Sequence, residues 1–98
     1  MLLPAAPDDV GLLVAQGELT VSGMNAFDQW SHVAGEDRAL AVRSAQHDAH
    51  HARRELLTAL QAALSTPVDQ EELYVLSERI DRVLTRATDA LREAEVLG

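Results

Sequence analysis

Apolar residues recur along this chain at intervals of three and four, with polar residues between them, in three long stretches. In the middle stretch the apolar or small positions are Val42, Ala45, Ala49, Ala52, Leu56, Ala59 and Ala63. In the last stretch they are Leu73, Leu76, Ile80, Val83, Ala87, Ala90, Ala94 and Leu97. This spacing gathers the apolar side chains on one face of a helix. The pattern therefore predicts two amphipathic helices, over residues 37–64 and 70–96.

The first stretch is apolar at every seventh residue and contains three glycines. Its expected inward positions are Leu12, Leu19, Ala26 and Val33, with Ala15, Gly23 and Trp30 on the alternate rungs. A glycine inside a helix costs up to ~1 kcal/mol relative to alanine. We interpret Gly11, Gly17 and Gly23 as points where another backbone approaches closely. The prediction is a helix over residues 8–34, ended by the break at Gly35.

A proline corner separates the second and third helices. Pro67 lacks an amide hydrogen and pushes Thr66 out of the helical region of backbone space. Asp69 is suited to cap the next helix, with Glu72 as its capping-box partner three residues on. Long helices joined by short connections favour an antiparallel bundle. We therefore predict an all-α fold, with one domain over residues 1–98 that forms an antiparallel three-helix bundle.

Composition excludes several classes of function. The net charge of −8 disfavours binding to nucleic acids or to anionic lipid surfaces, since both need a concentrated basic face. The absence of cysteine excludes disulfides and thiolate metal sites. No apolar run reaches the length that a membrane span needs, and Met1–Ala6 lacks the basic segment of a secretion signal. We expect a cytoplasmic protein without direct membrane insertion.

A cluster of histidines is the first candidate for chemistry. His47 and His51 are four residues apart on one helical face, a spacing that can chelate a divalent metal. Zinc prefers three or four ligands, and no second ligand pair is present in the sequence. We therefore interpret these two residues as solvated surface. His50 lies closer to the apolar face, as does Asp81 on the next helix; this pair can be an ordinary ion pair, which we favour, a metal-ligand pair or a proton-linked switch.

No catalytic constellation emerges from the rest of the sequence. Ser22 and Ser44 lie within helical patterns rather than in a nucleophile elbow. The glycines of the first helix are spaced six apart rather than bunched into a phosphate-binding loop. The many carboxylates fall on solvated faces, without the apolar isolation that acid–base catalysis requires. We expect a protein that is not an enzyme.

The proline corner resembles that of the PhoU-like family of phosphate-transport accessory proteins, which often accompany low-affinity phosphate (Pit) transporters. The matching run is Thr66-Pro67-Val68-Asp69-Gln70-Glu71-Glu72, then Leu73-Tyr74-Val75-Leu76, then Ile80-Asp81-Arg82-Val83-Leu84. The resemblance is close at the corner and loose elsewhere. It implies a helical regulatory module that modulates inorganic phosphate transport through protein–protein contact.

The resemblance also implies where a metal would bind. Family members bind metals through carboxylates four residues apart on adjacent helices, which fall here at Gln46 and His50 and at Asp81 and Thr85. Only Asp81 keeps a carboxylate, so the hard-cation ligand set is incomplete. We expect no resident cofactor, and keep a divalent metal at His50 and Asp81 as the alternative.

Length bears on the expected partners. PhoU-like proteins consist of two three-helix halves, and this chain resembles only the first. If this chain keeps the apolar surface that the second three-helix half normally covers, it should pair with itself or with another chain. We expect a homodimer, with a phosphate transporter or sensor protein as a further partner. The candidate contact surface comprises Trp30, Leu57, Leu60 and Leu64.

Two alternative functions remain open from the sequence. The first is a metal-binding helical protein that uses the cluster of His47, His50, His51 and Asp81. The second is a dimeric helical scaffold with no connection to phosphate.

Overall fold

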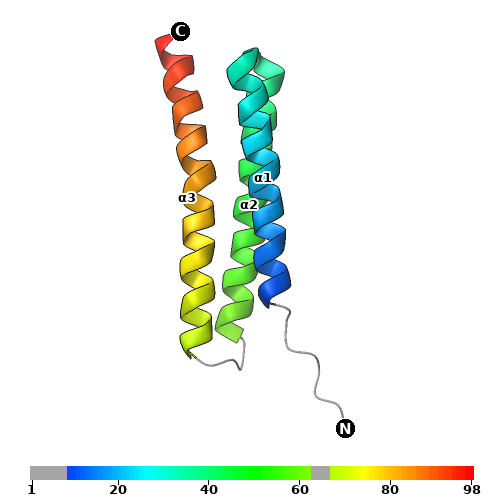
Figure 1. Cartoon of the computed structure of the whole chain (residues 1–98), viewed down its shortest axis with the longest axis vertical. Coiled ribbons are helices and arrows are strands. Elements are labelled where there is room, and N and C mark those ends of the chain that lie inside the picture. The colour runs from blue at the N-terminus through cyan, green and yellow to red at the C-terminus, as the bar shows by residue number, and fades with distance from the viewer. Residues whose placement is uncertain (1–8, 63–66) are drawn as a thin grey trace.

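The computed structural model describes residues 9–62 and 67–98, which form three α-helices and, within those ranges, no strand (Figure 1). Helix α1 spans Asp9–His32, α2 spans Glu36–Ala62 and α3 spans Pro67–Leu97. Helices α1 and α3 run in the same direction and α2 runs antiparallel to both. The predicted all-α three-helix bundle is therefore confirmed.

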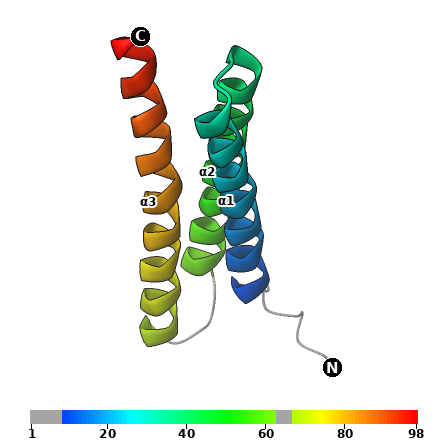
Figure 2. The same ribbon diagram turned by 45° about the horizontal axis from the view of Figure 1, so that its top comes forward.

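The bundle is a narrow rod, whose longest helix, α3, has 31 residues and so runs about 46 Å at 1.5 Å per residue. The turned view shows the three helices side by side along the long axis, with α1 and α2 as the closer pair (Figure 2). No helix in the described ranges has both the length and the apolarity that would let it cross a membrane. A rod this thin leaves each helix with a broad exposed face.

The core is built from small and medium apolar side chains in two clusters. One joins Ala39, Val42 and Leu91, with Ala26, Phe27 and Trp30 packed against them; Phe27 and Trp30 stack with ring centroids 5.8 Å apart. The other joins Ala49, Leu84 and Ala87, with Leu19, Met24 and Phe27 packed against them. The predicted inward face of α2 is confirmed, since Val42, Ala49 and Leu56 are all buried.

The inward face of α1 matches the prediction in part, since Gly23 is buried and Leu19, Ala26 and Trp30 pack against the core clusters. Its buried residues are Gln16, Thr20 and Gly23, whereas Ala15 and Val33 are exposed. A Cβ on Gly23 would lie 2.7 Å from Leu84 Cδ1, so a neighbour does approach this glycine closely, but it is a side chain and not the predicted backbone. The predicted close approach is wrong at Gly17, where an added Cβ would meet nothing within 4 Å.

The inward face of α3 is rotated by about one residue from the predicted one. The buried positions are Ser77, Leu84, Ala87, Thr88 and Leu91. By contrast, the predicted inward residues Leu76, Val83 and Leu97 are exposed, at 46%, 50% and 86% of their full accessible area. The apolar period alone misplaced this face because a serine, not a leucine, sits at its centre.

The corner between α2 and α3 also corrects the prediction. Because α3 begins at Pro67, Asp69 lies within the first helical turn and is not the N-cap, so the capping box with Glu72 is wrong. Proline suits a first helical position, where its missing amide hydrogen has no intrahelical partner to lose. Asp69 is favourable there because it lies at the positive end of the helix dipole. Leu64 and Thr66 lie outside the described residues.

The connection between α1 and α2 is closed by a side chain that the sequence did not single out. Arg38, on the first turn of α2, donates from Nη1 to the backbone oxygens of Gln29 (3.3 Å) and Val33 (3.0 Å). The last carbonyl groups of a helix lack intrahelical donors. Arg38 supplies donors there and fixes how α2 leaves α1.

Candidate functional site

A buried pair of polar side chains fixes α1 against α3. Ser77 Oγ donates to Gln16 Oε1 at 2.6 Å, and Gln16 Nε2 donates to the Ser77 carbonyl oxygen at 2.9 Å. Both residues are fully buried. The two partners are 61 residues apart in sequence. Because α1 and α3 run in the same direction, each residue of α1 in this region lies level with the residue 61 positions later in α3.

Beside this pair, an apolar groove opens between α1 and α3. It is lined by Leu13, Val14, Gly17, Glu18 and Val21 of α1 and by Ile80 of α3. Leu76 and Val83 lie one turn either side of Ile80 and so continue its face of α3. We call the apolar members of this surface the α1–α3 strip: Val10, Leu13, Val14, Gly17, Val21, Leu76, Ile80 and Val83.

The α1–α3 strip is unusually exposed for its composition. Val14 is 51% exposed and Val21 is 59% exposed on α1. On α3, Leu76 is 46% exposed and Val83 is 50% exposed. Scattered exposed apolar residues are ordinary, but a contiguous patch across two helices marks an interaction surface. It is the strongest candidate site in the described part of the chain.

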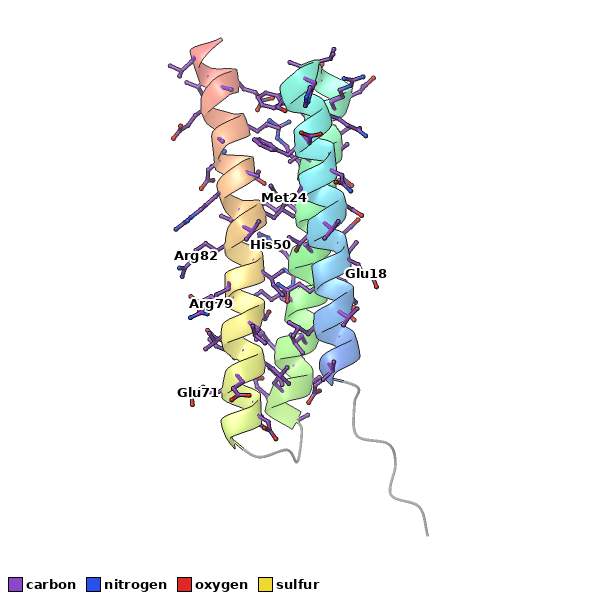
Figure 3. The ribbon with its side chains drawn as sticks, viewed as in Figure 1. Glu18, Met24, His50, Glu71, Arg79 and Arg82 are labelled. Carbon is purple, nitrogen blue, oxygen red and sulfur yellow. The ribbon has the colours of Figure 1, made fainter. Side chains whose placement is uncertain are left out.

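Charged residues flank the strip with opposite signs. Glu18 lies on the α1 side and Arg79 on the α3 side, level with each other because their numbers differ by 61. Figure 3 shows the two side chains pointing away from the bundle on opposite sides. Neither residue forms an ion pair within residues 9–62 and 67–98. Glu18 and Arg79 therefore lie on opposite edges of the strip, while the exposed Glu72, four residues before Leu76, also lies on the α3 side.

The structure brings His50 and Asp81 together, as the sequence suggested. His50 Nε2 lies 2.9 Å from Asp81 Oδ1, and their side chains are 45% and 22% exposed. The geometry is that of an ordinary ion pair or of a hydrogen bond from a neutral imidazole. Either form links α2 to α3.

The other histidines lie apart from this pair. His51 Nε2 contacts Glu55 Oε1 at 2.8 Å along the exposed face of α2, and His47 is exposed. The described helices contain no group of three or more histidine, cysteine, aspartate or glutamate side chains placed to hold a metal ion. The cluster of four predicted as an alternative metal site thus divides into separate contacts.

Further polar contacts join α2 to α3 along the same edge as His50. The Arg53 guanidinium lies over the Tyr74 ring, 5.8 Å from its centroid, a cation–π arrangement. Arg43 pairs with Glu95 near the opposite end of the bundle. Gln46 and Thr85, at the remaining metal positions of the family, are half-buried on α2 and α3.

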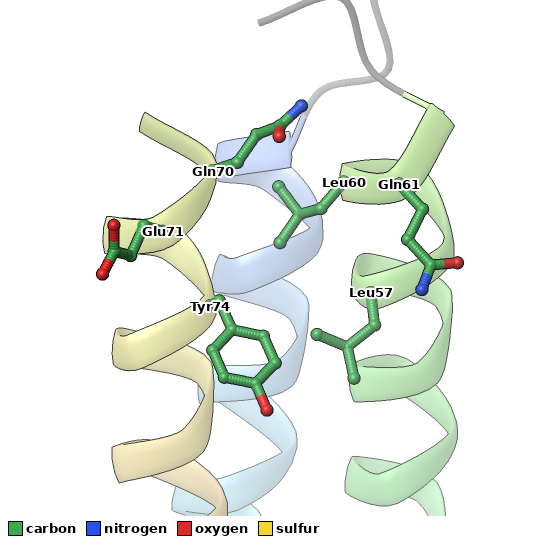
Figure 4. Close-up of a pocket in the computed structure, with 6 residues that line it drawn as sticks. All are labelled: Leu57, Leu60, Gln61, Gln70, Glu71 and Tyr74. Atoms are coloured by element: carbon green, nitrogen blue, oxygen red, sulfur yellow. The ribbon is translucent and has the colours of Figure 1, made fainter. Parts of the chain in front are cut away.

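The predicted contact surface of Trp30 and the leucines is not a single surface. Trp30 packs into the core cluster beside the α1–α2 connection, whereas Leu57 and Leu60 lie at the other end of α2. Leu60 is buried, and Leu57 lines a small hollow with Gln61 and Tyr74 (Figure 4). In that view Tyr74 and Leu57 point toward each other and Glu71 points away. The apolar surface that the sequence implied lies instead between α1 and α3.

Two features of the site were missed from the sequence, for different reasons. The α1–α3 strip is visible in the sequence as Val10, Val14 and Val21, which fall outside the seven-residue pattern of the first helix. The Gln16–Ser77 pair carries no signal of its own, because polar residues inside a helical pattern are ordinarily solvated.

Compared with family models, with curated proteins and with solved structures, the chain matches none.

Proposed function

We propose that this chain is a non-enzymatic helical module that acts through protein–protein contact, with the α1–α3 strip as its contact surface. The observation that carries the proposal is the exposure of four large apolar residues on adjacent helix faces: Val14, Val21, Leu76 and Val83. Burying an exposed valine or leucine side chain is worth about 1.5–3 kcal/mol. A partner that covers the strip would therefore gain binding free energy from several residues at once.

The chemistry of the remaining surface is consistent with this role. His50 and Asp81, the titratable pair that the sequence singled out, contact each other across α2 and α3. Catalytic sites place such groups in a concave pocket, beside a position for the reacting atom. The exposed surface, and not the bundle fold, carries the functional information, because one fold hosts many activities.

We further propose that the module is cytoplasmic and regulates inorganic phosphate transport, by contact with a transporter or sensor protein. The support for this narrower role is the resemblance of the corner from Thr66 to Leu76, with Ile80 and Asp81 beyond it, to the PhoU-like family. The exposed apolar strip supports a role in protein–protein contact. The resemblance of the corner to the PhoU-like family suggests a phosphate transporter or sensor as the partner.

The test combines deletion of the gene with measurement of radiolabelled phosphate uptake in the cell that makes this chain. Deletion should change the uptake rate, and the wild-type chain should restore it. Val83→Glu places a charge in the strip and should fail to restore uptake. Val33→Glu is the matched control, because Val33 is 60% exposed, against 50% for Val83, but lies beyond the end of α1, off the strip. Unchanged uptake after deletion would contradict the phosphate role.

A further inference from the structure

We propose that the occupant of the α1–α3 strip is a second copy of this chain, placed so that α1 of each copy lies against α3 of the other. This inference deepens the proposed function, on which it rests for the use of the strip as a contact surface. The predicted dimer thereby acquires a defined interface and orientation.

The first argument is charge complementarity across the strip. A twofold axis parallel to the bundle moves α1 of one copy over α3 of the other and keeps every residue at its own level along the rod. Glu18 and Arg79 share one level and lie on opposite edges of the strip. Each Glu18 therefore faces Arg79 of the second copy, and the contact occurs twice.

The charges of α1 disfavour the other twofold arrangement of the strip. An axis perpendicular to the bundle would lay α1 against α1 of the second copy. Helix α1 contains no lysine or arginine, and its carboxylates are Asp9, Glu18 and Asp28. Like charges brought together at an interface are destabilising. Helix α3 is also acidic overall, with eight carboxylates and four arginines, but it carries Arg79 at the level of Glu18, so only the parallel axis gives Glu18 a cationic partner.

Apolar contacts follow from the same geometry. Val14 is level with residue 75 and Val21 with residue 82, each one residue, or about 1.5 Å along the helix, from Leu76 and Val83. In the proposed dimer Val14 therefore lies near Leu76 of the second copy, and Val21 near Val83. These four residues form the exposed centre of the strip. The parallel twofold arrangement that pairs Glu18 with Arg79 therefore also buries these four apolar side chains.

The experiment is a charge exchange, read by sedimentation equilibrium at micromolar concentration. Glu18→Arg alone, or Arg79→Glu alone, places like charges opposite each other twice per dimer and should raise the dissociation constant about tenfold. The double variant restores opposite charges with the signs exchanged, and its dissociation constant should return close to the wild-type value. Circular dichroism of each variant checks the fold; both positions are exposed, so the helix content should not change.

Two results would overturn the second copy as occupant. One is a wild-type chain that stays monomeric at micromolar concentration. The other is a double variant that dissociates as readily as the single variants or more so. Neither result touches the proposed function if Val83→Glu still fails to restore phosphate uptake while Val33→Glu succeeds. Conversely, a dimer that follows the charge exchange beside unchanged uptake after deletion would contradict only the phosphate role.

Discussion

Single residues decide how closely the helices of this bundle approach. Gly23 is buried, and the space for its missing Cβ is occupied by Leu84 and by the Cβ of Ala45, which would lie 3.2 Å away. Leu84 is itself fully buried and cannot move aside without disturbing its own cluster. Because Gly23 has no side chain, Leu84 of α3 can pack directly against the backbone of α1.

Gly23→Ala should destabilise the protein by about 1–3 kcal/mol, because the added methyl group overpacks the contact with Leu84. Gly17→Ala is the matched control on the same helix; since an added methyl group meets nothing there, it should stabilise by about 0.5–1 kcal/mol through helix propensity. Urea unfolding in dilute solution measures both. Equal effects at the two glycines would show that the close approach at Gly23 does not matter.

How much the sequence predicts at this scale depends on the kind of residue. The pairing of His50 with Asp81 follows from their places beside two apolar faces. The role of Gly23 followed from the cost of glycine in a helix, but the same reasoning was wrong at Gly17, since propensity cannot tell a crowded glycine from an open one. Distinguishing them requires the position of the neighbouring helix.

At the scale of helices, the Gln16–Ser77 pair sets the register of α1 against α3. Leucine and alanine contacts are compatible with several registers, since they are not directional. Two hydrogen bonds between fully buried groups are satisfied in only one. The register in turn aligns Glu18 with Arg79, so the interface proposed above depends on this buried contact.

Ser77→Ala should destabilise by about 1–3 kcal/mol, because it leaves Gln16 Oε1 buried without its donor. In the double variant Gln16→Leu, Ser77→Ala both polar side chains are replaced by apolar ones, and much of that loss should be recovered. Thermal and urea unfolding of the two single variants and the double variant complete the cycle. Strict additivity would mean that the two side chains do not depend on each other.

The helices themselves were predictable, and their faces only in part. Long runs with a three- and four-residue period gave the three helices, and the small residues of α2 gave its buried face. The face of α3 and part of the face of α1 were misplaced because Gln16, Thr20, Ser77 and Thr88 are buried. Thr20 and Thr88 satisfy their hydroxyl groups on carbonyls of their own helices, which lets polar residues face the core.

At the scale of the whole molecule, the shape of the rod explains why a partner is expected. Three helices enclose only a narrow core, so Val14 and Val21 of α1 and Val83 of α3 remain outside it. Small domains bury a smaller fraction of their surface than large ones. A second copy over the α1–α3 strip would extend the core across the interface without any change within the subunit.

The central claim, that α1 of one subunit covers α3 of the other, is tested most directly by cysteine pairing between chains. The wild-type chain has no cysteine, so Val21→Cys and Val83→Cys each introduce a single thiol. Under mild oxidation, a mixture of the two variants should form disulfide-linked dimers much faster than either variant alone. Equally fast linking by Val21→Cys alone, or no linked dimer in any sample, would contradict the account.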